Sequence, residues 1–210
     1  MNEQYFSHAV AHDVHTEITN GLDLLATVKH PIATIYGSHR VNEEDYALCI
    51  EVSRLLTQIG FAICSGGGSG IMEAANTTAR KAGVPSIGLR GDAFKEEHVD
   101  ADIYTHEITF HFVFVRRFML CLKSRALLFF PGGYGTLNEL MEILCLMQSN
   151  IIERVPIILM KKPFWQGMYD WFGELEASDK IRPEDLALIS FADTPEDVKR
   201  ILIEHVGSQS

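Results

Sequence analysis

The 210-residue sequence lacks the features that mark membrane, secreted and nucleic-acid-binding proteins. No window holds the ~18 uninterrupted apolar residues of a membrane span, and the N-terminus has neither the basic start nor the apolar centre of a signal peptide. Basic residues are also few, because 18 Lys and Arg stand against 28 Asp and Glu and the net charge is -10. This charge opposes attraction to DNA, RNA or anionic lipid. We therefore expect a cytoplasmic protein with no nucleic acid or membrane partner.

Cysteine pairs with metal-site or disulfide spacing are absent as well. The four cysteines stand singly in apolar surroundings, with no CxxC pattern; they are Cys49, Cys64, Cys121 and Cys145. This arrangement is typical of reduced core residues.

One row of histidines has a spacing that a metal could use. His8, His12 and His15 are four and three residues apart, which places them along one face of a helix. Only Asp13 and Glu17 lie nearby as acidic partners, and an N-terminal helix often has a polar, solvated face. We therefore predict no metal site, and no cofactor.

Strand and helix patterns alternate along most of the chain. At 210 residues and 47% hydrophobic content, the chain suits one domain with a full core. Short apolar runs predict strands at 31–38, 61–64, 84–89, 104–109, 126–130 and 155–160. Helical signals lie at 42–59, 65–83, 110–122, 136–147, 164–176 and 194–206. The expected fold is α/β, a Rossmann-like parallel sheet with helices on both faces, in one domain at 31–210 preceded by a helical extension at 1–30.

The chain is organised around PGGYGTLNEL at 131–140, which joins a strand pattern to a helix pattern. Gly132, Gly133 and Gly135 allow backbone conformations that are closed to other residues, and they leave room for a ligand. A second glycine turn, SGGGSG at 65–70, follows another predicted strand. Because ligands bind beyond the carboxyl ends of parallel strands, both turns are candidate binding sites.

Two polar residues indicate what the first of these turns binds. Thr136 is predicted to start the helix, where unpaired N–H groups and the positive helix end attract an anion, most often a phosphate. Glu139 follows one turn later on the same helix face. The pair predicts a phosphorylated substrate on which the carboxylate acts.

Common nucleotide-binding fingerprints are missing from both turns. The third glycine of GxGxxG is replaced by Ile71 in one turn and by Asn138 in the other, and there is no GxxxxGK[ST]. Neither NAD binding nor ATP hydrolysis of the P-loop kind is therefore supported.

Three motifs occur together: GGGSGIMEAAN at 66–76, FVRRFML at 114–120 and PGGYGTLNE at 131–139. They resemble the LOG family, the cytokinin riboside 5'-monophosphate phosphoribohydrolases long labelled lysine decarboxylases, and the likeness covers roughly 32–203. The resemblance implies a nucleotide-binding catalytic domain in a Rossmann-like homodimer, with active sites near the subunit interface. It also implies hydrolysis of the N-glycosidic bond of a nucleoside 5'-monophosphate to free base and ribose 5-phosphate.

By position, the resemblance makes Arg116 and Glu139 catalytic. A carboxylate suits the oxocarbenium-like ribosyl group that forms when the bond breaks. A guanidinium with a pKa above ~12 is a poor proton donor, so Arg116 is assigned to charge stabilisation and positioning, and Arg117 to neutralising phosphate. Further substrate-binding residues are predicted in the glycine turns and after the first strand, namely Gly132, Gly133, Tyr134, Gly135, Thr136, Gly67, Gly68, Gly37 and Ser38.

Some positions differ from the family pattern. Asn138 replaces an acid that commonly precedes the motif glutamate, and Arg125 stands where plant-type members often have Asp. The region 90–110 also departs from the pattern. Within it, the charged segment 90–102 is expected to form a mobile loop over the site that contributes to the choice of base.

Other functions remain open at this point. The same residues would serve a broader purine or pyrimidine nucleotide nucleosidase in salvage, or a nucleotide or cofactor carrier without turnover. Lysine decarboxylation would need pyridoxal phosphate on a lysine. The one lysine near the motifs, Lys123, is predicted on the exposed side of its helix.

Overall fold

The computed structural model describes residues 8–93 and 99–208. Its strands form one seven-stranded sheet in the order β4-β3-β2-β1-β5-β6-β7, and every neighbouring pair is parallel. The strands are β1 (Ile32–Tyr36), β2 (Ala62–Ser65), β3 (Ser86–Gly91), β4 (His106–Phe110), β5 (Ser124–Phe129), β6 (Ile157–Met160) and β7 (Ile189–Ala192). The predicted α/β fold with a parallel sheet is confirmed.

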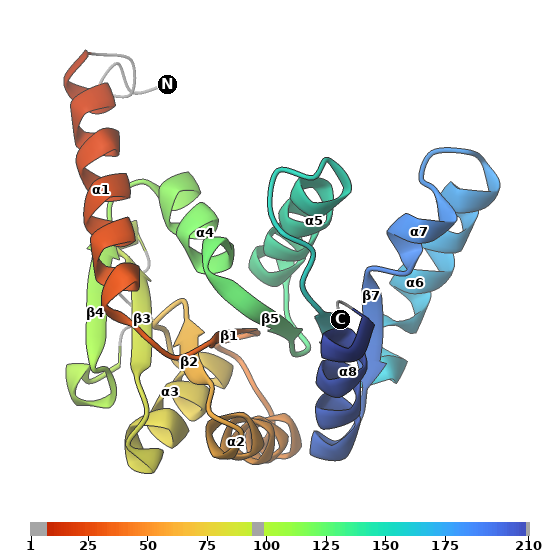
Figure 1. Ribbon diagram of the computed structural model, residues 1–210, viewed down its shortest axis with the longest axis horizontal. Helices are drawn as coiled ribbons and strands as arrows, with labels where there is room; N and C mark the ends of the chain where they lie inside the picture. The colour runs from red at the N-terminus through yellow and green to blue at the C-terminus, as the bar shows by residue number, and fades with distance from the viewer. Residues whose placement is uncertain (1–7, 94–98, 209–210) are drawn as a thin grey trace.

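Helices cover both faces of the sheet (Figure 1). One face carries α1 (His8–Thr27), α4 (Val113–Leu122), α5 (Tyr134–Gln148), α6 (Lys162–Ala177) and the short α7 (Pro183–Leu186). The other carries α2 (Glu43–Gln58), α3 (Ile71–Ala82) and α8 (Pro195–Ser208). A 3-10 turn at Ala101–Ile103 precedes β4.

The central strand β1 shows why two helical layers are needed. Ala33 and Ile35 are buried in the core beneath α2, α3 and α8, whereas Ile32 and Tyr36 are buried in the core beneath α4 and α5. Successive side chains of a strand point to opposite faces, so a strand that is apolar at every position must be covered twice.

The direction in which successive strands are added to the sheet reverses between β1 and β5. From β1 the chain adds β2, β3 and β4 toward one edge, and then returns through α4 to place β5 on the other side of β1. The loops after β1 and β5 therefore lead to opposite faces, and they meet where the N–H of Ser38 donates to the carbonyl of Pro131 at 3.3 Å. Such a switch point is where open α/β sheets bind ligands.

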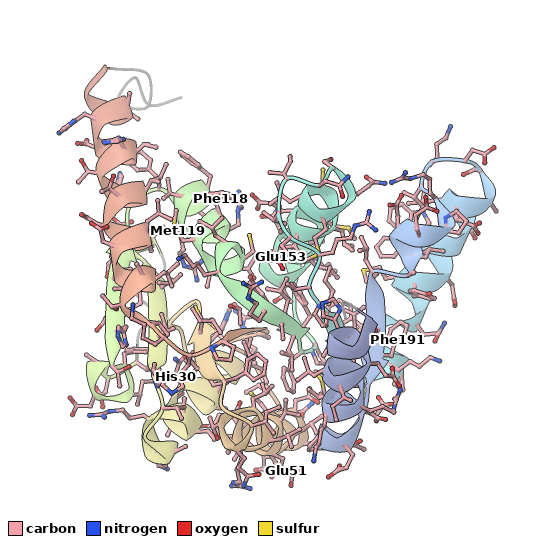
Figure 2. All side chains as sticks on the ribbon, in the orientation of Figure 1. His30, Glu51, Phe118, Met119, Glu153 and Phe191 are labelled. Atoms are coloured by element: carbon pink, nitrogen blue, oxygen red, sulfur yellow. The ribbon has the colours of Figure 1, made fainter. Side chains whose placement is uncertain are left out.

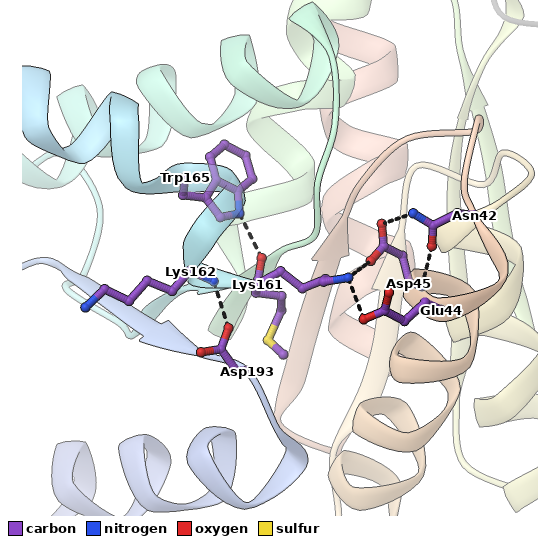
Figure 3. Close-up of polar contacts among 8 residues, drawn as sticks. Asn42, Glu44, Asp45, Lys161, Lys162, Trp165 and Asp193 are labelled. Atoms are coloured by element: carbon purple, nitrogen blue, oxygen red, sulfur yellow. Dashed lines mark hydrogen bonds and ion pairs between the residues drawn. The ribbon is translucent and has the colours of Figure 1, made fainter.

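A charged cluster links the two halves of the sheet on the far side of this crevice (Figure 3). Lys161, at the end of β6, contacts Glu44 at 2.8 Å and Asp45 at 2.9 Å in the first turn of α2. Asn42 caps α2, because its Oδ1 accepts from the N–H of Asp45 at 2.8 Å. Lys161 has a left-handed backbone (φ 66°), a conformation that costs about 1 kcal/mol or more and is retained only where the surroundings hold it.

Several boundaries differ from the predictions. The helix expected from residue 110 begins at Val113, because Phe110 pairs with Gly91 in the β3–β4 ladder. The last strand, β7, was not predicted, since its short apolar run resembles a turn segment until it is placed beside β6. The predicted loop at 90–102 starts later, because residues 90 and 91 belong to β3. Its central part, 94–98, lies outside the described residues.

Helix α1 lies within the predicted N-terminal extension and packs on α4 and β4. A Cβ on Gly21 would lie 3.1 Å from the Sδ of Met119 and 3.2 Å from the ring of Phe110, so glycine permits this close contact. Met119 lies between α4 and α1 (Figure 2). Leu25 of α1 is also buried in the core shared with α4.

Glu17 of α1 caps the beginning of α4. Its carboxylate accepts from the N–H of His111 at 2.7 Å and from the N–H of Phe112 at 3.2 Å. A carboxylate at this position also interacts favourably with the positive end of the helix. The extension therefore fixes the start of α4.

Replacing Glu17 by alanine is expected to lower the free energy of unfolding by about 1 kcal/mol, because two N–H groups lose their acceptor. Urea denaturation measures the change. Asp23→Ala, at an exposed position on the same helix, is the matched control and is expected to change stability little. Equal losses in the two variants would contradict the capping role.

The described residues contain no group of three or more His, Cys, Asp or Glu arranged to hold a metal ion. His12 and His15 are exposed, and the side chain of His8 lies outside the description. Among the described helices, none is long and apolar enough to cross a membrane.

Candidate active site

A pocket of about 280 Å³ lies at the switch point between β1 and β5. The structure brings eight of the predicted site residues together in its lining, namely Gly37, Ser38, Arg116, Gly133, Tyr134, Gly135, Thr136 and Glu139. They come from the loop after β1, from α4 and from the first turns of α5. The pocket thus joins the predicted anion site to the predicted catalytic pair.

Helix α5 begins two residues earlier than predicted. Gly133 is its N-cap and Tyr134 its first residue, so Thr136 is buried within the first turn and does not start the helix. Among the residues that the structure describes, no side-chain hydrogen bond caps this end of α5. The first N–H groups of a helix need acceptors from outside the helix, and here they adjoin the pocket.

The three motif glycines serve to make room, and their backbone conformations are ordinary. The prediction of unusual conformations is wrong, because none of Gly132, Gly133 and Gly135 has a positive φ. A Cβ on Gly132 would lie 2.2 Å from the Oγ1 of Thr136, whereas a Cβ on Gly133 or Gly135 would meet nothing within 4 Å. Gly132 thus permits close packing inside the turn, and the other two leave open space at the pocket.

The loop after β1 forms the opposite wall. A Cβ on Gly37 would lie 2.7 Å from the side chain of Ile71, so glycine allows this loop to pack against α3. Ser38 is held by its neighbours, since its Oγ accepts from the N–H of Arg40 at 2.9 Å and its carbonyl accepts from the N–H of Ile71 at 3.2 Å. The wall is built largely from backbone.

Arg116 is buried and lines the pocket from α4. Its Nε donates to the carbonyl of Leu89 at 2.6 Å, and its Nη2 donates to the carbonyl of Gly66 at 3.0 Å. Leu89 lies within β3 and Gly66 directly follows β2, so two neighbouring strands orient the guanidinium. A Cβ on Gly66 would lie 2.1 Å from Nη2, and only glycine leaves space for this contact.

Glu139 is partly buried on α5 and lines the same pocket. Burial raises the pKa of its carboxyl from 4.5 to about 7; Arg116 and Arg117 oppose this shift, and Glu142 adds to it. Removing a carboxylate from water disfavours its charged form. The group can therefore gain or lose a proton near neutral pH, which is useful for acid–base chemistry.

Arg117 lies outside the pocket lining and joins α4 to α5. Its Nη1 donates to the Oδ1 of Asn138 at 2.5 Å, and its Nε is 2.9 Å from the Oε2 of Glu142. Asn138, one of the positions that differ from the LOG pattern, thus supplies an acceptor to Arg117. The other departure, Arg125, forms an exposed ion pair with Glu153 at 2.5 Å.

Three predicted glycines also lie outside the lining. Gly67 and Gly68 are buried in the turn after β2, where Gly67 has a left-handed backbone and a Cβ would lie 2.4 Å from Arg90. Gly132 adjoins Thr136, as described above. Binding of substrate by these glycines and by Arg117 stays a prediction.

The lining also contains residues that sequence reasoning missed, namely Ile35, Tyr36, His39, Gly66 and Met72. Tyr36 precedes Gly37 and His39 follows Ser38, so extending that predicted pair by one residue on each side would have found both. Gly66 and Met72 lie within the motif at 66–76, although only Gly67 and Gly68 of that motif were assigned to the site.

Comparisons with known proteins indicate the family of the chain. A sequence profile described as "Possible lysine decarboxylase" matches residues 72–202, more than half of the chain. A probable cytokinin riboside 5'-monophosphate phosphoribohydrolase, LOGL6 of Oryza sativa subsp. japonica, is 22% identical over 193 residues, 88% of this chain and 77% of that protein. A bifunctional cytokinin biosynthesis protein of Fusarium pseudograminearum is 36% identical over 76 residues, which are 36% of this chain and only 16% of the fungal protein.

Solved structures share the fold. The molybdenum cofactor binding protein of Rippkaea orientalis has a TM-score of 0.64 at 22% identity, with 85% of this chain and 98% of that chain covered. The molybdenum cofactor carrier protein of Chlamydomonas reinhardtii has a TM-score of 0.62 at 21% identity, with 83% and 99% covered. From the profile match and the three motifs, the chain belongs to the family described as possible lysine decarboxylases, which is the LOG family.

Proposed function

We propose that this protein hydrolyses the N-glycosidic bond of a nucleoside 5'-monophosphate, AMP or a cytokinin nucleotide, to free base and ribose 5-phosphate. One observation carries the proposal: a single pocket combines the uncapped N-terminus of α5, the guanidinium of Arg116 and the carboxyl of Glu139. The family membership and the names of the plant relatives support the same reaction. A homodimer remains part of the proposal, as the resemblance implies.

The phosphate is assigned to the first turn of α5. Helix N-termini bind phosphate through backbone N–H groups and the helix dipole. Gly133 and Gly135 leave the surface there open, and the hydroxyl of Thr136 lies in the same turn. With the phosphate in this position, the ribose lies over Glu139, one turn further along α5.

The carboxylate of Glu139 is assigned to the sugar. As the bond between C1' and the base nitrogen breaks, its electron pair moves to the base and positive charge develops on the ribosyl group, which a nearby carboxylate stabilises. Water adds to C1', and its proton passes to the carboxylate of Glu139. The same proton then goes to the nitrogen of the departing base, which gives the neutral free base and restores the carboxylate. Arg116 stays charged throughout and stabilises the electron density that the departing base gains.

Lysine decarboxylation fits the pocket poorly. That reaction would need pyridoxal phosphate as an electron sink, and the cofactor would be attached to a lysine. Within the described part of the chain, no lysine lines the pocket. Lys123 is exposed at the end of α4, and Lys161 is ion-paired with Glu44 and Asp45.

A panel of nucleotides tests the proposed function. The protein is incubated with AMP, GMP, CMP, UMP and isopentenyl-AMP, and free base and ribose 5-phosphate are quantified by chromatography. We expect the two products in equal amounts from AMP or isopentenyl-AMP. Equal rates on every base would instead favour a general nucleosidase, and binding without turnover on the whole panel would favour a carrier.

A further inference from the structure

We propose that Tyr36 is a positioning residue for Glu139. In this arrangement the Tyr36 hydroxyl donates a hydrogen bond to the ionised carboxylate of Glu139. The inference rests on the proposed function and extends it, because it names the residue that orients the proposed catalytic carboxyl of Glu139. It rests on three features of Tyr36: the position of its ring, the state of its hydroxyl and its charged neighbours.

The ring of Tyr36 is fixed at the switch point itself. It is the last residue of β1 and pairs in register with Phe129, the last residue of β5. The two rings stack with centroids 4.4 Å apart and planes 6° from parallel. Tyr36 is buried in the core beneath α4 and α5, the two helices that carry Arg116 and Glu139. The strand pair therefore aims the phenol toward the catalytic side of the sheet.

The hydroxyl of Tyr36 is buried and forms no hydrogen bond with any residue that the structure describes. The residue is 3% exposed and yet belongs to the pocket lining. Buried hydroxyl groups nearly always have a partner, so this one calls for an explanation. Hydrogen bonds of catalytic groups are often long or misaligned in ligand-free structures, so the ligand-free geometry does not decide against Tyr36 as a donor.

The groups around the phenol agree with a donor role. Burial, followed by the charges of Cys121, Glu139 and Cys64, raises the pKa of Tyr36 well above 10, and Arg116 opposes this shift. The phenol therefore keeps its proton at neutral pH. Among these neighbours, the thiol of Cys121 already donates to the carbonyl of Phe118 at 3.2 Å. Glu139 supplies a strong acceptor, because an ionised carboxylate has only acceptor sites.

The carboxyl of Glu139 has several charged or titratable neighbours besides Tyr36. Arg116 and Arg117 reach it from α4, Glu142 lies on its own helix, and His39 lines the pocket from the loop after β1. A test must therefore observe this carboxyl directly. A hydrogen bond from a neutral phenol favours the ionised form without adding a charge.

Carbon-13 NMR of glutamate-labelled protein provides this observation, with the Glu139 signal assigned by its loss in Glu139→Gln. Tyr36→Phe retains the stacked ring and removes the hydroxyl. We expect the titration midpoint of Glu139 to rise by about 1 pH unit, the size expected for a hydrogen bond to a charged group. An unchanged midpoint would overturn the proposal.

Tyr104→Phe is the matched control, because the hydroxyl of Tyr104 is also buried without a partner among the described residues. Its charged neighbours are Arg90, Glu107 and Glu73, and Glu139 is not among them. The control is expected to leave the Glu139 midpoint unchanged, and an equal shift in both variants would also overturn the proposal. If Tyr36→Phe does not fold, a fluorinated tyrosine is placed at position 36 instead. Its hydroxyl is a more acidic donor, so we expect the titration midpoint of Glu139 to fall. An unchanged midpoint in this variant would equally overturn the proposal.

The activity readout separates this inference from the proposed function. In Tyr36→Phe, the acidic limb of the kcat profile is expected to move up by the same ~1 pH unit. If no nucleotide releases its base, the proposed function fails, while the NMR titration still decides whether Tyr36 acts on Glu139.

Discussion

Replacing Glu139 by glutamine is expected to lower kcat about a thousand-fold and to change the affinity for AMP less than about threefold. The amide has nearly the same shape but carries no negative charge, so stabilisation of the ribosyl cation is lost while the phosphate site at α5 is kept. Single-turnover release of ribose 5-phosphate and isothermal calorimetry measure the two effects. Near-normal turnover in this variant would remove Glu139 from the mechanism.

The same carboxyl determines how activity depends on pH. Because the pKa of Glu139 is raised to about 7 and the ionised form is the active one, kcat is expected to be half-maximal near pH 7. Below that it falls about tenfold per pH unit, and Glu139→Gln is expected to lose this dependence.

Stability is expected to change in the opposite direction. The folded-state pKa of Glu139 is raised above 4.5, so the folded protein binds the proton more tightly, and stability falls as the pH rises from 4.5 to about 7. Above pH 7, Glu139→Gln removes a buried charge and is expected to stabilise the protein by about 1 to 3 kcal/mol. At pH 4 the difference should be small. Urea denaturation at both pH values checks this, and a destabilised variant at pH 8 would contradict it.

Arg116→Lys is expected to lower kcat/KM about a hundred-fold. The charge is kept, but a single ammonium group cannot reproduce the planar donors that hold the carbonyls of Leu89 and Gly66. Small displacements of a catalytic group cost rates of this order. Steady-state kinetics on AMP measure the loss, and wild-type kcat/KM in the lysine variant would show that charge alone suffices.

Gly66→Ala tests the same geometry while leaving the arginine in place. The new Cβ would lie 2.1 Å from Nη2, so the guanidinium must move, while the backbone at Gly66 does not have a positive φ. We expect a loss of kcat/KM of about ten-fold or more. Gly167→Ala is the control, because it lies in α6 and a Cβ there meets nothing within 4 Å. Comparable losses in both variants would indicate a general effect of alanine.

Much of the fold follows from local patterns. The short apolar runs predicted six of the seven strands. The strand β7 was missed because nothing local distinguishes its four residues from a loop. Its pairing with β6 depends on how α6 and α7 return the chain to the sheet edge.

The candidate site was predictable wherever a motif is continuous in sequence. Gly133, Tyr134, Gly135, Thr136 and Glu139 belong to one continuous motif and line one pocket. Tyr36 was missed because its importance depends on register with Phe129, which is far away in the sequence. Sequence also cannot separate a glycine needed for its φ from one needed for space, and for this reason the role of Gly132 was misjudged.

The position of the crevice between β1 and β5 determines when the pocket is completed during folding. The chain must complete β2, β3, β4 and α4 before β5 can be inserted beside β1, so the decisive pairing is non-local and slow to form. A growing or partly folded chain that holds only β1 to β4 has one wall of the pocket and lacks Glu139. Such an intermediate lacks the proposed catalytic carboxylate, so the proposed activity requires that the two halves of the sheet have joined.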